Sequence, residues 1–372
     1  MEVFRSDLSM GRRGSTASIV MVSPRYAPAI GGVERHIQRV AEELATRGHR
    51  VTILTESHAR GLPGREDTGG ISVRRIPYVW ARTWPLKLLW ILTTVRSLGD
   101  ADVVHFHDVT TLLWGLPLVI TRLKRGTFIT YHGYEKDPVP ATWRILRRLG
   151  SRLVEGELCI GRFIKSMYGV QCDQVSVGAT DPRRPASAAA GGTVFVGRLE
   201  KDTGVLEYIR ALGIVKREHG LQVPLTLCGV GRLEQSIRET ASTEKVDVKL
   251  VGSARDPLAS MAKSRVCFAA GYLSMLEAMS LGLPVIGVAV SPLRLAYLKS
   301  MRDAGAPISI QRSPEGIARE IVRAFSDSAL YASLSRRGQA FAAEMTWKRM
   351  ADLYIELWSK SPVLGRDSHL RS

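Results

Sequence analysis

The chain of 372 residues is long enough for two domains of ordinary size, and its 45% hydrophobic and 23% charged residues are typical of globular proteins. No apolar run reaches the ~20 residues of a membrane-spanning helix, and residues 1–16 are polar and basic without the apolar core of a secretory signal, so we expect a disordered tail there. The 52 Lys and Arg outnumber the 35 Asp and Glu, and the formal charge of +17 favours an anionic partner such as membrane lipid, nucleic acid or a phosphorylated ligand.

The redox state of the cysteines indicates the cellular compartment of a protein, and this chain has Cys159, Cys172, Cys228 and Cys267. Their spacing matches neither a CxxC motif nor a zinc site. Cys228 and Cys267 lie in apolar, strand-like runs, which predicts buried and reduced thiols. Reduced thiols favour a cytosol-like compartment.

The first predicted unit is a strand, a long loop, a helix and a second strand, at residues 18–23, 33–47 and 51–54. Gly31 and Gly32 stand directly before the helix, where backbone N–H groups can face a phosphate. A plain tight turn explains two glycines equally well. The loop lacks GxGxxG, which counts against a dinucleotide-dependent dehydrogenase.

Two basic and aromatic stretches follow in the same half of the chain. A strand predicted at residues 70–75 ends in two arginines, and residues 76–99, which follow it, contain no acid. The rings and cations of this first basic stretch are Arg74, Arg75, Tyr78, Trp80, Arg82, Trp84, Lys87, Trp90 and Arg96. Residues 143–152, WRILRRLGSR, repeat this character. Rings at headgroup level and cations against anionic lipid suit a membrane surface, but an amphipathic helix with solvated charges, packed on the domain, is an even alternative.

Histidines gather at the next two strands, which are predicted at residues 101–106 and 127–131. His132 stands at the carboxyl end of the second strand, where ligands of parallel sheets bind. This position makes His132 a candidate catalytic residue, although a lone histidine is more often a polar residue with satisfied hydrogen bonds. His105 and His107 are expected to shape the same region.

Asp100 and Asp102 form a D-x-D pair, a spacing that holds a metal ion in another class of enzymes. This pair precedes its strand, whereas sites in parallel sheets follow the strands. We therefore interpret the pair as part of the entry to the strand and expect no metal site.

Residues 176–192, SVGATDPRRPASAAAGG, mark the clearest boundary, because they are rich in Pro, Ala and Gly and have no periodicity. Parallel α/β units lie on both sides of this stretch. The sequence therefore predicts an α/β protein with two Rossmann-like domains that face a central cleft. We place them at residues 17–177 and 193–345, with a linker at 178–192, a helix at 346–360 and a polar tail at 361–372.

The second half begins with a strand at residues 193–196, and Arg198 follows it. At the carboxyl end of a strand, the Arg198 guanidinium can clamp a diphosphate through two hydrogen bonds, although a surface arginine is the plain alternative. Gly229 and Gly231 stand in the loop after the next strand, residues 225–228.

Residues 266–288, VCFAAGYLSMLEAMSLGLPVIGV, read as a strand, a loop, a helix over 272–281 and a second strand. Peptide N–H groups at the start of this helix can hold phosphates, and they belong to Gly271, Tyr272, Leu273 and Ser274. Glu277 on the helix either faces solvent or accepts hydrogen bonds from the hydroxyl groups of a ligand.

Five motifs, taken in chain order, resemble those of the retaining GT-B glycosyltransferases of family 4. They are P-x-x-G-G-V-E-R-H around Gly31, T-x-H-G at His132, V-G-R-L at Arg198, G-x-G at Gly229 and L-E-A-M-S-L-G-L-P-V-I-G at Glu277. The resemblance covers about residues 17–359. It implies the GT-B fold, in which the C-terminal helix crosses back to the first domain.

The resemblance also implies roles for the candidate residues. Gly31 and Gly32 would approach the donor phosphates and the acceptor. His132 would lie near the donor sugar and the bond being made. Arg198 would meet the diphosphate, and Glu277 would bind the ribose of a sugar nucleotide.

Further positions follow or depart from the family pattern. The backbone at Gly229 and Gly231 would lie against the nucleotide. The family has a second Glu at the donor sugar, eight residues before Glu277, and this chain has Ala269 there. The family also has Lys-Gly five residues after the arginine, whereas Lys201 is offset by two, so Lys201 reaches the diphosphate by another path or the site has one cation fewer.

The function implied by the resemblance is transfer of a sugar from a nucleotide diphosphate sugar to an acceptor hydroxyl, with retention and with no metal or other cofactor. The acceptor would be a glycan or a lipid-linked molecule in cell-surface glycan or glycolipid assembly. The basic stretches favour a cytoplasmic protein that is peripheral on the inner face of the cell membrane, and no nucleic-acid-binding signature is present. Alternatives are an epimerase or hydrolase of sugar nucleotides on the same fold, and a non-catalytic member that binds a nucleotide or a partner protein.

Overall fold

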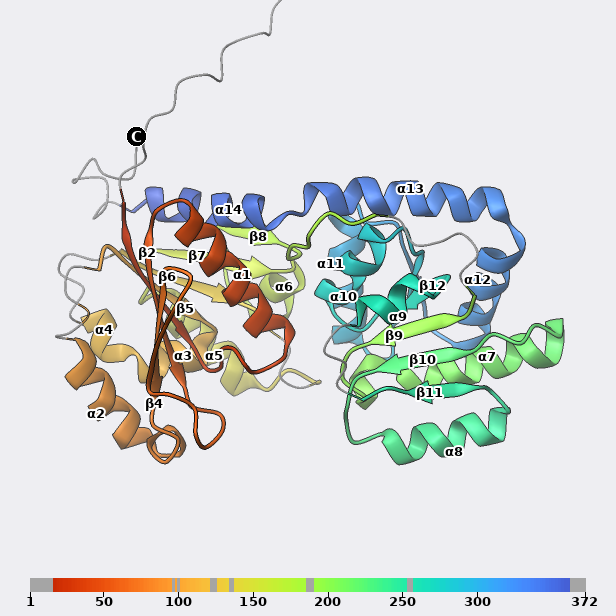
Figure 1. The fold of residues 1–372 in the computed structure, drawn as a ribbon, viewed down its shortest axis with the longest axis horizontal. Coiled ribbons are helices and arrows are strands. Elements are labelled where there is room, and N and C mark those ends of the chain that lie inside the picture. Colours follow the sequence, from red (N-terminus) through yellow and green to blue (C-terminus); the bar gives the residue numbers. More distant parts are fainter. Residues whose placement is uncertain are drawn as a thin grey trace, which may run out of the picture.

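The computed structural model describes residues 16–95, 98, 101–120, 126–133, 137–184, 191–252 and 257–361. Within these ranges the chain forms two α/β units that lie side by side, each built around its own sheet (Figure 1). The tails expected at residues 1–16 and 361–372 lie outside the described residues, except for residues 16 and 361 at their inner ends.

The first sheet has the described strands in the order β3-β4-β2-β1-β5-β6-β7-β8. Neighbouring strands run parallel, except that β3 pairs antiparallel with β4 at the edge. The strands are β1 (Ser18–Ser23), β2 (Arg50–Glu56), β3 (Arg65–Thr68), β4 (Ile71–Ile76), β5 (Val103–His107), β6 (Gly126–Tyr131), β7 (Gly156–Ile160) and β8 (Gln174–Ser176). The central strands β5 and β6 are buried along their whole length, which is typical of parallel strands covered on both faces.

The helices of the first unit are α1 (Gly32–Thr46), η1 (Trp80–Arg82), α2 (Trp84–Val95), α3 (Val109–Trp114), α4 (Leu116–Ile120), α5 (Ala141–Ser151) and α6 (Phe163–Tyr168). Helix α1 buries a stripe that includes Ile37, Val40 and Leu44, spaced three or four residues apart, so its apolar face packs on the sheet. Helices α1 and α14 cover one face of the sheet, and α2, α3 and α5 cover the other (Figure 1).

The second sheet is parallel throughout its described strands, in the order β11-β10-β9-β12-β13-β14. These strands are β9 (Thr193–Val196), β10 (Leu225–Cys228), β11 (Val248–Leu250), β12 (Val266–Phe268), β13 (Val285–Val288) and β14 (Ile308–Gln311). The helical elements are η3 (Lys201–Thr203), α7 (Val205–His219), α8 (Glu234–Glu244), α9 (Leu258–Ala262), α10 (Tyr272–Ser280), α11 (Pro292–Asp303), α12 (Pro314–Ser326), α13 (Ser328–Glu344) and α14 (Trp347–Ser359). Two Rossmann-like units are therefore confirmed.

Both sheets have a point at which the strand order reverses, because successive crossovers proceed to opposite sides of the first strand. In the first sheet it lies between β1 and β5, and in the second between β9 and β12. Ligands of doubly wound sheets bind at the carboxyl ends of the strands at such points.

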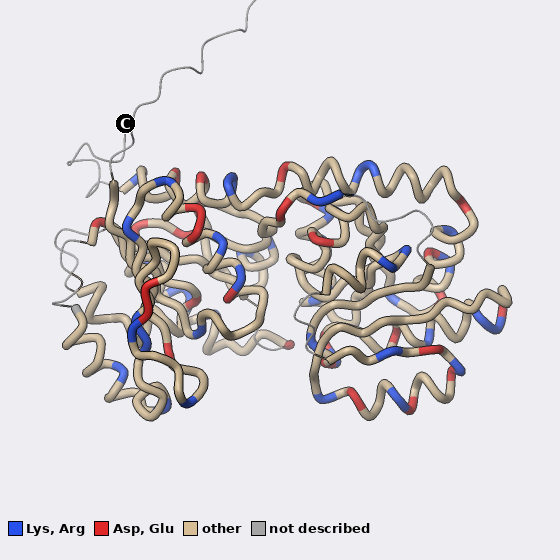
Figure 2. Tube along the Cα trace, viewed as in Figure 1, with Lys and Arg blue, Asp and Glu red and all other residues tan. Residues whose placement is uncertain are grey.

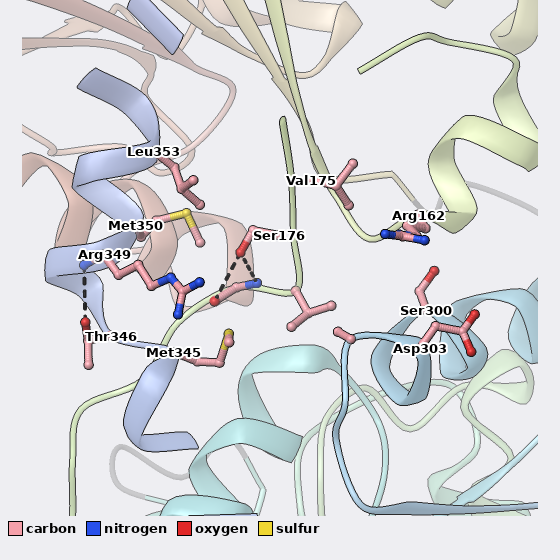
Figure 3. Close-up of a pocket in the computed structure, with 13 residues that line it drawn as sticks. Arg162, Val175, Ser176, Ser300, Asp303, Met345, Thr346, Arg349, Met350 and Leu353 are labelled. Atoms are coloured by element: carbon pink, nitrogen blue, oxygen red, sulfur yellow. Dashed lines mark hydrogen bonds between the residues drawn. The ribbon is translucent and has the colours of Figure 1, made fainter. Parts of the chain in front are cut away.

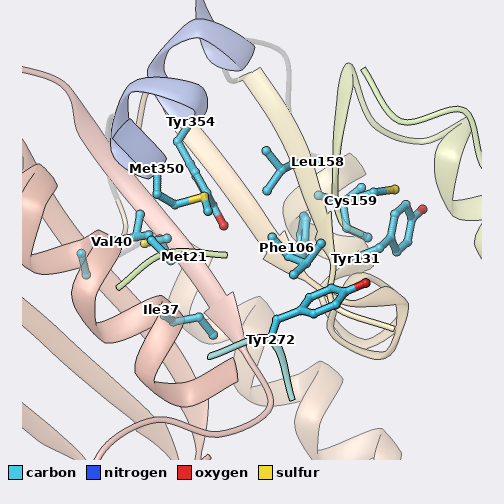
Figure 4. Close-up of a cluster of buried hydrophobic side chains, with 14 of the residues drawn as sticks. Met21, Ile37, Val40, Phe106, Tyr131, Leu158, Cys159, Tyr272, Met350 and Tyr354 are labelled. Carbon is cyan, nitrogen blue, oxygen red and sulfur yellow. The ribbon is translucent and has the colours of Figure 1, made fainter. Parts of the chain in front are cut away.

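The C-terminal helix α14 returns to the first unit, as the family resemblance implies. It packs against α1, β7 and β8, and Tyr354 and Trp358 are buried there. Where the chain first crosses between the units, the Thr180 amide donates to the Met345 carbonyl at 2.7 Å, so the two crossings lie side by side. Figure 4 shows α14, α1 and α10 contributing side chains to one apolar cluster, with Tyr272 from the second unit.

Two cations of the first basic stretch depart from the membrane-facing hypothesis, whereas Val79, Trp84 and Leu92 of the same stretch are exposed. The Arg75 side chain is 2% exposed and pairs with Glu66 at 2.9 Å, and Lys87 pairs with Glu56 at 2.6 Å. The prediction that Arg75 and Lys87 face lipid is therefore wrong, because carboxylates of the same unit pair with both. Arg96 lies outside the described residues.

The cysteines divide into two pairs. Cys228 and Cys267 are free and buried, as expected. Cys159 on β7 and Cys172 are joined in a disulfide, which the sequence did not predict. Their spacing of 13 residues gives no motif, and only the return of the chain after α6 brings them together.

Candidate active site

The start of α10 lies where the strand order of the second sheet reverses. Arg198 follows β9, and Gly271 directly precedes α10, which follows β12. The loops after the two strands touch, because a Cβ added at Gly197 would clash with the Cβ of Ala270. The fold therefore brings Arg198 and the first turn of α10 together, as the phosphate hypothesis requires.

Internal partners occupy part of the helix start. The Gly271 amide donates to the Ser274 hydroxyl at 3.2 Å, and the Tyr272 amide donates to the Tyr297 hydroxyl at 2.7 Å. Among the described residues, the amides of Leu273 and Ser274 have no hydrogen-bond partner. Two of the four amides expected to face phosphate are thus already bound, and two remain.

A buried arginine that sequence reasoning missed stabilises this loop. Arg294 on α11 is 2% exposed, and its guanidinium donates to the carbonyls of Ala269 at 2.7 Å and Ala270 at 2.8 Å. The sequence offers no signal for it, because PLRLAYLK reads as an ordinary amphipathic helix. Ala269, which stands where the family has Glu, is thus fixed by the hydrogen bond from Arg294 to its backbone carbonyl.

The predicted diphosphate cations lie at the surface of this region. The Arg198 side chain is 62% exposed and pairs with Asp202 at 2.7 Å. Its charge acts on Tyr297, whose pKa burial raises to about 12 while Arg294 and Arg198 oppose the rise. Lys201 is exposed in η3, and among the described residues it forms no ion pair. A diphosphate here would compete with Asp202 for Arg198.

Glu277 is buried and is bound by the first unit. Only 3% of its side chain is exposed, and its Oε1 lies 2.8 Å from a guanidinium nitrogen of Arg35 on α1. The predicted ribose ligand therefore already holds a cation from the opposite unit. Sequence reasoning missed Arg35, since an Arg beside Glu34 near a helix start reads as a solvated surface residue.

The glycines after β10 have a steric reason. A Cβ on Gly229 would clash with the Gly197 carbonyl, and one on Gly231 would clash with the Leu199 carbonyl. Only glycine lets this loop pass directly over the loop after β9. Their closeness to a nucleotide stays a prediction.

Gly31 and Gly32 lie at the start of α1, in the loop after β1. Gly31 is the N-cap residue and Gly32 is the first helical residue. A Cβ on Gly32 would meet open space, whereas one on Gly31 would clash with the Glu34 carboxylate. The space beside Gly32 is therefore open where a Cβ would lie.

His132 lies at the end of β6 and is joined to a second histidine. One ring nitrogen, Nε2, is 3.0 Å from Nδ1 of His107, and the two rings are stacked with centroids 5.4 Å apart. Burial, helped by the charge of Arg147, lowers the pKa of His132 to about 3. His132 is therefore neutral at physiological pH, and its Nδ1 forms no hydrogen bond to a described residue.

A chain of hydrogen bonds runs from α14 to His36, which lies beside this histidine pair. The Trp358 indole can only donate, so His105 Nδ1 accepts at 3.0 Å and His105 Nε2 donates to Thr130 at 2.7 Å. Thr130 in turn donates to the Tyr354 hydroxyl, which donates to Nε2 of His36 at 2.9 Å.

His36 ends this chain edge-on to His132, with ring centroids 4.9 Å apart. Burial lowers the pKa of His36, His105 and His107 as well, so the whole cluster is held neutral. Sequence reasoning missed His36, although its place beside Ile37 on the buried face of α1 was a readable signal.

Asp108 follows His107 at the point where the first sheet reverses. Its φ of 70° is rare for a residue other than glycine. Its carboxylate is 2.9 Å from Arg147, a fully buried guanidinium 4.1 Å from the ring centroid of Tyr168. The pair fixes the backbone next to the histidines. Asp102, at the opposite end of β5, accepts the Ser18 amide at 2.7 Å, as expected for a residue at a strand entry.

A cavity of about 260 Å³ lies at the junction of the two units (Figure 3). It is lined by residues of β8, α11 and α14, among them Ser176, Asp303 and Arg349. None of the predicted site residues lines it. We therefore do not assign it to the candidate active site.

The described residues show how charge is distributed and whether they contain a metal-binding cluster or a membrane-spanning helix. Lys and Arg are spread over both units rather than gathered on one (Figure 2). No group of three described His, Cys, Asp or Glu side chains is arranged to hold a metal ion. Within the described ranges, no helix is both long and apolar enough to span a membrane.

In a comparison with known protein families, each of the two units matches one family model. The model described as Glycosyltransferase Family 4 matches residues 30–166, and the model described as Glycosyl transferases group 1 matches residues 191–327. Over most of its length the chain is similar to a D-inositol 3-phosphate glycosyltransferase of Nocardiopsis dassonvillei. The two are 24% identical over 88% of this chain and 89% of that protein.

Other curated relatives match in part. One subunit of the phosphatidylinositol N-acetylglucosaminyltransferase of Arabidopsis thaliana is 32% identical over 26% of this chain, and a glycogen synthase of Mycobacterium tuberculosis is 24% identical over 61%. The matched part spans 22% and 65% of those two proteins, less than two thirds of either.

Solved structures share the fold. A sucrose-phosphate synthase from Thermosynechococcus elongatus superposes with a TM-score of 0.75 at 18% identity, covering 93% of this chain and all of that one. HepE from Anabaena, solved with UDP and glucose, has a TM-score of 0.71 at 14% identity and covers 92% of this chain and 99% of its own. With a family model on each unit and this arrangement of the two sheets, the chain belongs to the GT-B glycosyltransferases.

Proposed function

We propose that the protein transfers a sugar from a nucleotide diphosphate sugar to an acceptor hydroxyl, with retention of configuration. The observation that carries this proposal is the convergence of Arg198, the first turn of α10 and the buried Glu277 where the second sheet reverses. A cation, free helix amides and a carboxylate match a diphosphate and a ribose. The family models and the UDP bound by HepE support the same donor class.

Charge on the leaving diphosphate would be offset by this chain's own groups, with no metal or other cofactor. Arg198, Lys201 and the amides of Leu273 and Ser274 are the groups in place for it. His132 is neutral and would act as a hydrogen-bonding group at the sugar, not as a cation. Because Ala269 carries no carboxylate, the donor sugar lacks the contact that the family usually provides.

The acceptor would be a glycan or a lipid-linked molecule in cell-surface glycan or glycolipid assembly. The names of two relatives point this way, since one acts in phosphatidylinositol glycosylation and the other on an inositol phosphate. We place the protein on the inner face of the cell membrane as a peripheral protein.

Helix α5 favours that location better than the first basic stretch does. Exposed cations recur every four residues, at Arg144, Arg148 and Arg152, beside a row of exposed aliphatic residues at Ile145, Leu149 and Leu153. Helix α5 contains no acid. Such rows suit the headgroup boundary of an anionic bilayer, where each cation contributes about 1 kcal/mol.

Thermal shift with a panel of nucleotide diphosphate sugars tests the donor. The correct donor raises the melting temperature, because a ligand bound only by the folded state stabilises it. No stabilisation by any member would reject the proposal, and free sugar or an epimer formed from donor alone would favour the epimerase or hydrolase alternative.

Co-sedimentation with anionic vesicles tests the membrane face. The variant R144Q/R148Q/R152Q should lose most of its binding at low salt, whereas R319Q/R336Q/R337Q, with the same change of charge on exposed residues of α12 and α13, should keep it. Equal binding of the two variants would reject α5 as the contact.

A further inference from the structure

The loops after β1, β2 and β4 carry arginines that take no part in the proposed donor site. Arg25 follows β1, Arg60 follows β2 and Arg82 follows β4, and all three are exposed. Since β4, β2 and β1 are neighbours in the sheet, their carboxyl ends present these residues at one edge. Among the described residues, none of the three forms an ion pair with a carboxylate.

An aromatic ring gathers two of these cations. The guanidinium carbon of Arg60 lies 5.9 Å from the ring centroid of Tyr78, and that of Arg82 lies 5.0 Å from it. Tyr78 is therefore a shared contact of two cations, each of which attracts an oxyanion.

The third cation and a histidine complete the cluster. Burial lowers the pKa of His58, and the charges of Arg25 and Arg75 lower it further, while Glu34 opposes them. Nδ1 of His58 is enclosed and has no hydrogen-bond partner among the described residues. At His58 the charges of Arg25 and Arg75 therefore act together, and the Glu34 carboxylate acts against them.

A buried guanidinium joins two of these loops to the sheet. Arg75 on β4 donates to the Ala27 carbonyl at 2.8 Å and to the Pro63 carbonyl at 3.1 Å, and it pairs with Glu66. It thereby joins the loop after β1, the loop after β2 and the edge of the sheet. The cluster is held together before any ligand arrives, which reduces the entropy cost of binding.

We propose that Arg25, Arg60 and Arg82, with His58, form a subsite for a phosphate group on the acceptor. The proposal rests on the proposed function, because the subsite lies in the unit that faces the donor site and at the strand ends next to the reversal point of the first sheet. Guanidinium groups bind phosphate through paired hydrogen bonds, and Tyr78 keeps two of them oriented. The phosphate belongs to a soluble sugar phosphate or to a lipid headgroup.

Calorimetry with inorganic phosphate as the probe tests the subsite without donor or turnover. The variant R25Q/R60Q/R82Q should bind phosphate about tenfold more weakly or worse, and R319Q/R336Q/R337Q should bind it as the parent does. R198Q should also retain this binding. If R198Q loses phosphate binding and the triple variant keeps it, phosphate occupies the donor site and the proposal is wrong.

Two further measurements identify the source of the phosphate and distinguish failure of the subsite from failure of the proposed function. Glucose 6-phosphate in solution and vesicles containing phosphatidic acid are compared, and the one whose binding depends on the three arginines identifies the source. If neither depends on them, the subsite is rejected. Affinity of the triple variant for the nucleotide sugar chosen by thermal shift should be unchanged, so loss of the subsite is distinguishable from failure of the proposed function.

Discussion

Replacement of Arg35 by Gln tests how the donor site is held before the donor binds. Oε1 of Glu277 is 2.8 Å from the Arg35 guanidinium in the structure, and the same carboxylate is proposed to accept the ribose hydroxyl groups. The arginine and the ribose would therefore compete for one oxygen. In Arg35→Gln the Glu277 carboxylate loses this ion pair in the free protein.

The magnitude follows from the burial of the pair. The two charged groups lie 2.8 Å apart, although Oε1 of Glu277 accepts no hydrogen bond of standard geometry from a described residue, and solvent at the 33% exposed Arg35 side chain screens the ion pair to roughly 1 kcal/mol. The free protein should be destabilised by about that amount. Because a bound ribose would restore hydrogen bonds to Glu277, nucleoside affinity should rise about fivefold.

The assay is calorimetry with the nucleoside of the donor found by thermal shift, together with urea unfolding of the free protein. Arg47→Gln is the matched control, because Arg47 lies just past the end of α1 and pairs with Asp352 on α14 instead of the site. This control should leave nucleoside affinity unchanged. Glu277→Gln should weaken nucleoside binding and should remove the effect of Arg35→Gln in the double variant.

Weaker nucleoside binding by Arg35→Gln would refute the competition, since it would mean that Arg35 is itself a ligand of the nucleotide. Unchanged affinity would mean that Arg35 and the ribose use different oxygens of Glu277. Both outcomes differ in sign or size from the expected rise.

Three further predictions follow from the site. Arg198→Ala should weaken binding of the nucleoside diphosphate about tenfold or more and binding of the nucleoside much less, as measured by calorimetry, and equal affinities would remove Arg198 from the site. His132→Ala should lower the rate of sugar transfer while donor affinity stays near that of the parent, and a normal rate would make His132 structural. Because the pKa of His132 is lowered to about 3 from 6.5, the folded state binds fewer protons than the unfolded state between these values, so stability falls as pH drops below 6.5. At pH 5 the loss from His132 alone is about 2 kcal/mol, and urea unfolding at pH 7.5 and pH 5 should show a smaller loss in His132→Gln.

Local patterns in the sequence determined the individual units of the fold. Short apolar runs predicted β1, β9 and β10 with the bounds that the structure has, since a strand buried on both faces reads as a continuous apolar segment. Glycines before the predicted helices marked the starts of α1 and α10 to within one residue, since glycine is among the residues favoured at an N-cap. Edge strands such as β3, made of charged residues, gave no such signal.

The tertiary structure alone decided which side chains meet. Arg35 and Glu277 lie on helices of different units, and no periodicity within either helix could reveal their contact. Arg75 and Lys87 looked like surface cations until the fold placed Glu66 and Glu56 beside them. The neutral histidine cluster likewise depends on α14 returning from the far end of the chain to bury it. Burial and charge pairing act through space, so a pattern along the chain fixes the elements but not the electrostatics of the site that they enclose.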